Sequence, residues 1–145
     1  MSDFLGKLQD GGFTLFIIKG GKPIFSSKME GMGPLLEAIN TVEPSKLHGS
    51  IVVDKMVGKA AALLICLFKA QEVHTHIMSL RATKVLDKYD VKYAFEKVVP
   101  ELLNKFGTDI CPFEKAIIAT DDLEEGFKRL TSEAKRISAL KKAIV

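Results

Sequence analysis

Two runs of apolar, β-prone residues occur in the first part of the chain. Residues 13–18 are apolar on both faces of an extended chain, which predicts a strand that is covered on two sides and lies inside a sheet. A second β-prone run follows at residues 23–26. The turn between the two runs contains Gly20 and Gly21, and two glycines accept the positive φ of a tight turn. The pattern therefore predicts a β-hairpin.

Strands and helices alternate in the middle of the chain. The predicted order of strand, helix, strand, helix and strand falls at residues 50–53, 56–71, 73–78, 81–89 and 91–95. A shorter helix comes before them, beginning at Pro34 and ending at Pro44. Such alternation requires right-handed crossovers and parallel pairing. The helix at 56–71 is apolar nearly all round, which predicts a buried central helix.

The rest of the chain is predicted to be helical, with interruptions at Pro100 and at residues 107–112. From Asp121 onward, apolar residues recur at intervals compatible with heptads: Leu123, Phe127, Leu130, Ala134, Ile137 and Ile144. Acidic residues open this helix and lysines close it, as the helix dipole favours. Two roles remain open for the stripe at 121–144, which either covers the sheet or forms a homodimer contact.

Composition narrows the class of protein. The 145 residues suit a single domain, 1–145, and a net charge of +3 does not indicate a nucleic-acid partner. The longest apolar run, residues 60–68, is shorter than the ~20 residues that cross a bilayer, and residues 1–4 do not resemble a secretory signal. Cys66 and Cys111, with three histidines, are too few and too scattered for a structural zinc site. We expect a cytoplasmic protein without membrane partner or cofactor.

The junction between strand 50–53 and the central helix is the first candidate site. It contains Asp54, Lys55, Gly58 and Lys59. The free N–H groups of a helix start attract anions, the glycine allows close approach, and the lysines add positive charge. The alternative is structural, with Asp54 capping the helix, Gly58 permitting close packing and both lysines solvated.

A second candidate site lies near Cys111. Pro112 suits the first position of a helix, and Glu114 is expected to fold back onto the cap of that same helix. Cys111 would then lie at a helix N-terminus, where the local field lowers the pKa of a thiol. Three roles remain open for this cysteine: nucleophile, ligand-lining residue, or packed side chain.

The histidines and the other cysteine suggest less chemistry. His74 and His76 are two residues apart on a predicted strand, so both rings project from one face, a spacing that metal sites use. No third ligand accompanies them, and hydrogen-bonded polar histidines are the simpler interpretation. Cys66 lies within the apolar helix and is predicted to be a core residue.

The two candidate segments resemble a family of prokaryotic domains of unknown function, of the DUF1893 type. Its members carry Asp-Lys-x-x-Gly-Lys-Ala-Ala-Ala at a strand-to-helix junction and a later Cys-Pro-x-Glu, found here at residues 54–62 and 111–114. The likeness extends from about Phe13 to about Ala116. It implies a cytidine-deaminase-like fold: α/β, with three α/β/α layers and a mixed sheet in which an N-terminal hairpin precedes parallel strands. Residues 121–144 form a C-terminal helical extension beyond the likeness.

The same resemblance argues against zinc chemistry. Zinc deaminases carry His-x-Glu or Cys-x-Glu at the start of the helix after the strand, and Pro-Cys-x-x-Cys at the start of the next helix. The corresponding segments here are residues 56–61 and 78–82, which contain neither pattern. We therefore expect no metal and no deamination by that route.

The leading functional expectation is a domain that binds a small anion, phosphorylated or nucleotide-like, because ammonium groups and helix N–H donors replace the zinc apparatus. The expected ligand-binding residues are Asp54, Lys55, Gly58, Lys59, Cys111 and Glu114. One alternative is a metal-independent enzyme, with Asp54 or Glu114 as base and Cys111 as nucleophile or acid. Another is a homodimeric regulatory subunit that associates through the C-terminal helix.

Overall fold

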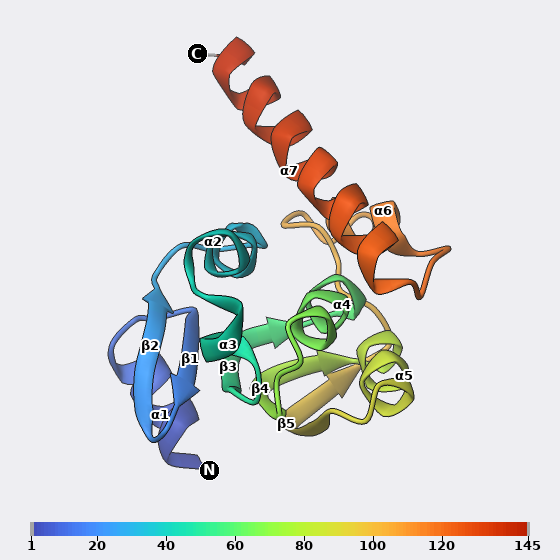
Figure 1. The fold of residues 1–145 in the computed structure, drawn as a ribbon. Helices are drawn as coiled ribbons and strands as arrows, with labels where there is room; N and C mark the ends of the chain where they lie inside the picture. The colour runs from blue at the N-terminus through green and yellow to red at the C-terminus, as the bar shows by residue number, and fades with distance from the viewer. Residues whose placement is uncertain (1, 145) are drawn as a thin grey trace.

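A computed structural model describes residues 2–144, which form five strands and seven helices (Figure 1). The strands are β1 (Leu15–Lys19), β2 (Lys22–Ser27), β3 (Ile51–Val57), β4 (Glu72–Ser79) and β5 (Lys92–Val99). The helices are α1 (Ser2–Asp10), α2 (Gly33–Thr41), α3 (Pro44–Leu47), α4 (Lys59–Leu67), α5 (Leu80–Lys88), α6 (Pro112–Ile117) and α7 (Leu123–Ile144). The chain is thus a mixed α/β protein.

The five strands form one mixed sheet in the order β2-β1-β3-β4-β5. β1 is antiparallel to both β2 and β3, whereas β3, β4 and β5 run parallel to one another. Gly20 and Gly21 both have positive φ, 60° and 76°, which allows the tight turn of the β1–β2 hairpin. The predicted hairpin, the internal position of β1 and the parallel strands are confirmed.

The two faces of the sheet carry different cores because neighbouring residues of a strand point to opposite sides. Ile17 and Val52 belong to the main core with α4, whereas Ile18 and Val53 pack with Leu5 and Leu8 of α1. Helices therefore cover both faces. α1 was not predicted, because its few apolar residues are too close to the chain start to establish a clear helical period.

α4 is the buried centre of the main core, as predicted, and every residue from Lys59 to Cys66 is buried. Its predicted start at Met56 is wrong. Met56 and Val57 continue β3 and pair with Ile77 and Met78 of β4. The sheet therefore extends three residues beyond Asp54, and the helix begins only at Lys59.

Two connections also differ from the prediction. Pro44 does not end α2, which stops at Thr41, but opens the short α3 instead. Residues 100–111 are irregular rather than helical, with an isolated bridge between Leu103 and Ile110. Within this segment the Asn104 side chain accepts hydrogen bonds from the backbone of Phe106 and Thr108, each 3.1 Å long. Asparagine favours such local turns over helix.

α7 is the longest helix and extends past the rest of the molecule (Figure 1). Its first half packs against α4 and α6, and Leu130 is fully buried there. The stripe therefore covers the central helix rather than the sheet itself. Leu140 is half exposed, and the side chain of Ile144 lies outside the described residues. Within residues 2–144, no helix combines the length and apolarity that spanning a membrane requires.

The two halves of α7 should differ in their contribution to stability. Leu130→Ala removes a fully buried side chain and should lower the free energy of unfolding by about 2–5 kcal/mol. Leu140→Ala, the matched change on the exposed half, should lower it by less than about 0.5 kcal/mol. Urea denaturation followed by circular dichroism measures both. Equal losses would show that the distal half also packs against protein.

Candidate functional site

The start of α4 is capped by a carboxylate from a distant part of the chain. Glu114, in α6, accepts hydrogen bonds from the backbone N–H of Lys59 at 2.8 Å and of Ala60 at 2.6 Å, one to each oxygen. Only 4% of Glu114 is exposed. A carboxylate at a helix start accepts hydrogen bonds from the free backbone amides, and its negative charge is stabilised by the positive end of the helix dipole. Here the interaction joins two helices that are 55 residues apart.

Gly58 provides the space for this carboxylate. A Cβ added to Gly58 would lie 2.4 Å from Oε1 of Glu114 and 2.6 Å from Cδ1 of Leu102. The φ of Gly58 is −103°, which any residue adopts. Glycine is therefore needed at this position for the space that it leaves and not for its backbone conformation. The glycine was predicted to admit a ligand to the main chain. In the structure it admits Glu114.

Lys59 also links α4 to the segment after α6. We call the contacts of Glu114 and Lys59 together the α4–α6 joint. Its Nζ lies 3.1 Å from the carbonyl oxygen of Ile118 and 3.0 Å from Oδ1 of Asp121, and the side chain is almost fully buried. The paired ammonium lowers the pKa of the Asp121 carboxyl. Lys59 thus holds the connection between α6 and α7 against the central helix.

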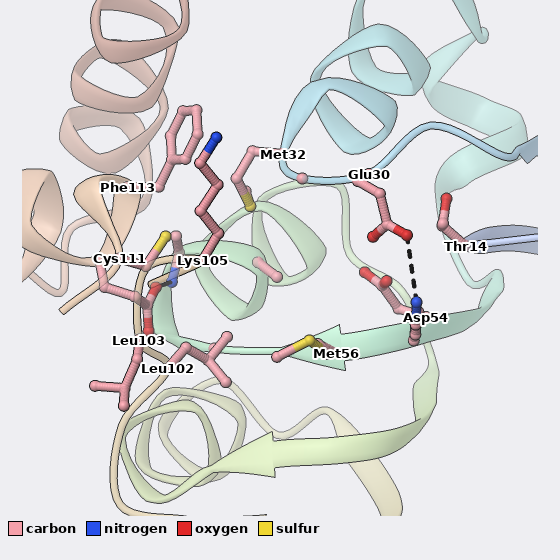
Figure 2. A pocket seen from close by; sticks show the side chains of 16 residues that line it. Thr14, Glu30, Met32, Asp54, Met56, Leu102, Leu103, Lys105, Cys111 and Phe113 are labelled. Carbon is pink, nitrogen blue, oxygen red and sulfur yellow. Dashed lines mark hydrogen bonds and ion pairs between the residues drawn. The ribbon is translucent and has the colours of Figure 1, made fainter. Parts of the chain in front are cut away.

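A cavity of about 310 Å³ lies beside this joint (Figure 2). We call it the β3–α6 cavity. Its walls come from the end of β3, the start of α4, the connection between β2 and α2, and the segment that leads into α6. The lining residues are Thr14, Glu30, Gly31, Met32, Asp54, Lys55, Met56, Gly58, Ala60, Ala61, Leu102, Leu103, Lys105, Cys111, Phe113 and Glu114.

Polar groups gather at two ends of the β3–α6 cavity, with apolar side chains between them. Asp54 and Glu30 lie at one end, and Lys105 and Cys111 lie at the other (Figure 2). The ammonium of Lys55 forms an exposed ion pair with Glu30 at 3.2 Å. This pair contributes little to stability, because exposed ion pairs are weak.

Asp54 is the most perturbed acid of the site. Burial raises its pKa from 3.8 to about 7, hydrogen bonds from the backbone of Lys55 and Met56 oppose the rise, and the charge of Glu30 adds to it. Among residues 2–144, no lysine, arginine or histidine forms an ion pair with Asp54. Burial also raises the pKa of Glu114, while its two amide donors favour the ionised form.

Comparison with known proteins places the chain in a family. Residues 4–133 match the family described as a domain of unknown function, DUF1893. The likeness is thus longer than the predicted span from Phe13 to Ala116 and includes the first half of α7. The chain belongs to this family. Its structure is similar to the crystal structure of a DUF1893 family protein, TM1506, from Thermotoga maritima, with a TM-score of 0.82, 32% identity, and coverage of 91% of this chain and 88% of that one. No match is found among curated proteins.

Five of the six predicted site residues of this DUF1893 domain line the same cavity: Asp54, Lys55, Gly58, Cys111 and Glu114. Lys59 does not, because its ammonium turns to Ile118 and Asp121. Glu114 was expected to cap its own helix, but it caps α4. The place predicted for an external anion is therefore occupied by a side chain of the protein. The binding role of the residues that line the cavity stays a prediction.

The cysteines and histidines of the DUF1893 domain fall in different surroundings. Cys66 is buried in α4, and burial raises the pKa of its thiol to about 12, so the predicted core role is confirmed. Cys111 is partly exposed and lines the cavity. His74 is buried and bonds to Glu72 at 2.7 Å, and His76 bonds to Glu96. Within the described part of the chain, no three metal-ligating side chains converge.

Several lining residues were not predicted. Glu30 and Met32 come from the connection between β2 and α2, which Thr14 holds by donating a hydrogen bond of 2.6 Å to the carbonyl oxygen of Met29. The sequence contained a signal for the turn only: Gly31 indicates a turn in this connection, and in the structure its φ is +87°, which glycine favours. Lys105 belongs to a segment that was expected to be helical, and its role in the wall had no sequence signal.

Gly58 and Glu114 should behave as one energetic unit. Gly58→Ala should destabilise by about 1–3 kcal/mol through overpacking, and Glu114→Ala by about 2–4 kcal/mol because two buried amides lose their acceptor. The double variant should lose less than the sum, because the alanine at 114 vacates the space that the new Cβ needs. A urea-denaturation double-mutant cycle measures the coupling.

The control for this cycle is Gly6→Ala, since nothing lies within 4 Å of a Cβ added to Gly6 in α1. That change should leave the protein as stable or raise stability by up to about 1 kcal/mol. Strict additivity of the Gly58 and Glu114 changes would contradict the proposed steric relationship between them.

Asp54 should make stability depend on pH. Its folded pKa of about 7 lies above the unfolded value of 3.8, so the folded state binds the proton more tightly. The contribution is fully present below pH 3.8 and is lost as pH rises through 7. Relative to Asp54→Asn, the wild type should lose on the order of 2–4 kcal/mol of unfolding free energy between pH 4 and pH 8. Parallel pH profiles for the two proteins would refute this.

Proposed function

We propose that this protein is a small-molecule-binding domain and that its site is the β3–α6 cavity. The observation that carries the proposal is the cavity itself, about 310 Å³ in volume, with an apolar wall and a few polar side chains at its ends. Ligand sites commonly have this composition. The cavity also lies at the carboxyl end of β3, where β1 pairing stops at Asp54, and open α/β sheets often bind ligands at such edges.

Most of the protein groups that were expected to bind an anionic ligand already interact with other residues of the protein. Glu114 occupies the first amides of α4, and the ammonium of Lys59 is bound to Asp121. Lys55 remains at the cavity but is paired with Glu30. A phosphorylated or nucleotide-like ligand would therefore rely on Lys105 at the other end of the cavity.

A metal-independent enzyme is the second candidate, and one observation favours it. Asp54 has a pKa of about 7 and lines the same cavity as the thiol of Cys111. A carboxyl that titrates near neutral pH suits general acid–base catalysis, and perturbed groups cluster at active sites. Glu114 drops out as a base in this alternative because both of its oxygens bind the start of α4.

Three further expectations belong with this proposal. Helices on both faces of the mixed sheet support a cytidine-deaminase-like layering, although fold does not fix function. The free thiols of Cys66 and Cys111 suit a reducing, cytoplasmic compartment. The half-exposed Leu140 on the distal part of α7 supports a homodimer contact through this helix.

Blocking the cavity should abolish binding without unfolding the protein. Met56 lines the cavity and is 42% exposed, so Met56→Trp places an indole there without disturbing the core. Leu80→Trp is the matched control, at a half-exposed position outside the cavity. Each protein is dialysed against one defined mixture of nucleotides, sugar phosphates, amino acids and amines, and the retained compounds are identified by mass spectrometry.

We expect the wild type and Leu80→Trp to retain at least one compound that Met56→Trp does not. The loss should be at least tenfold in retained amount, because the indole fills the space that the compound occupies. Melting temperatures confirm that both variants fold. Equal retention by all three proteins, or no retention by the wild type, would overturn the proposed function.

A further inference from the structure

We propose that the ligand of the β3–α6 cavity is an organic cation, or a molecule with paired N–H donors, and that Asp54 binds its positive end. This inference rests on the proposed function and names the class of ligand. The inference depends on which charged groups around the cavity have an oppositely charged or hydrogen-bonding partner within the protein and which do not.

Most charges near the cavity already have partners. Both oxygens of Glu114 accept hydrogen bonds from backbone amides at the start of α4. Lys59 is bound to Asp121, and Lys55 is bound to Glu30. Asp54 lines the cavity and accepts hydrogen bonds from the backbone of Lys55 and Met56, but it has no cationic partner within the described residues. The charge that the protein leaves uncompensated at this end is therefore negative.

The net charge at this end of the cavity favours a cation. Burial is the main cause of the raised pKa of Asp54, and the charge of Glu30 adds to it. An anion beside Asp54 would add to the negative charge there, whereas a cation would offset it, because Lys55 offsets only the charge of Glu30. A cationic group with two N–H donors in one plane matches the two oxygens of a carboxylate, as in the pairing of arginine with aspartate.

The rest of the cavity fixes the orientation of such a molecule. Met32, Met56, Leu102 and Phe113 supply an apolar wall that suits a flat hydrocarbon body. Lys105 stands at the far end, so a cation is disfavoured there and favoured beside Asp54 (Figure 2). Benzamidine combines a planar cation with an aromatic ring and is therefore the probe of choice.

Binding of the cation should strengthen as pH rises. Ionised Asp54 is the form that attracts a cation, and this carboxyl titrates at about 7. The other titratable groups that face it across the cavity are Glu30, Lys55, Lys105, Cys111 and Glu114. We expect the affinity for benzamidine to rise roughly thirtyfold between pH 5.5 and pH 8, in proportion to the ionised fraction of Asp54.

The experiment uses Cys111 to report occupancy. Benzamidine, benzamide and benzoate have nearly the same shape but are cationic, neutral and anionic, and inorganic phosphate is the fourth probe. Each is added at millimolar concentration, and alkylation of Cys111 by iodoacetamide is followed by mass spectrometry. Cys66 is buried and serves as the internal control for unfolding. The proteins are the wild type, Asp54→Asn and Glu37→Gln, an exposed acid outside the cavity.

We expect benzamidine to slow alkylation of Cys111 at least fivefold in the wild type and in Glu37→Gln, and to have no effect in Asp54→Asn. Benzoate and phosphate should protect least. Stronger protection by benzoate or phosphate than by benzamidine would overturn the cationic class while leaving the binding function intact. Absence of protection by every probe, together with no compound retained in dialysis, would overturn both.

Discussion

The contact between the Glu114 carboxylate and the first amides of α4 is the interaction on which this structure depends. α4 is the core of the molecule, and its start is buried, so its free N–H groups need acceptors from the protein. Glu114 satisfies two of them, and Gly58 makes room for it. The same contact fixes α6 on α4 and, through the bond from Lys59 to Asp121, the start of α7 as well.

This contact also determines the character of the neighbouring cavity. A helix start is ordinarily a site for external anions, because its amides and dipole favour negative charge. Here the protein supplies the anion itself, and the buried lysine beside it is neutralised by Asp121. The cavity that remains is lined by Asp54, whose carboxyl forms no ion pair with any cation in residues 2–144. The ligand class that we propose for this cavity is therefore cationic rather than anionic.

Sequence patterns predicted the strands and helices better than the tertiary contacts between them. The hairpin, the buried α4 and the parallel strands follow from local periodicity, which depends on nearby residues. The end of β3 could not be predicted, because the pairing of Met56 and Val57 with β4 is a long-range contact that the local pattern does not contain. The partner of Glu114 could not be predicted either, since the choice between its own helix and α4 depends on tertiary packing. Five of six site residues still line one cavity, because three lie together at the end of β3 and Glu114 brings the start of α6 to the start of α4.

The two segments that carry the family resemblance have one physical explanation. Gly58 and Lys59 belong to the first segment and Glu114 to the second, and the structure brings them into direct contact. A glycine at 58 without a carboxylate at 114 would leave buried amides unsatisfied, and a carboxylate without the glycine would clash. Gly58 and Glu114 therefore have a structural role together. Side chains that take no part in these contacts are the better candidates for binding or chemistry. Asp54 is one of these, since it faces the cavity without taking part in the joint.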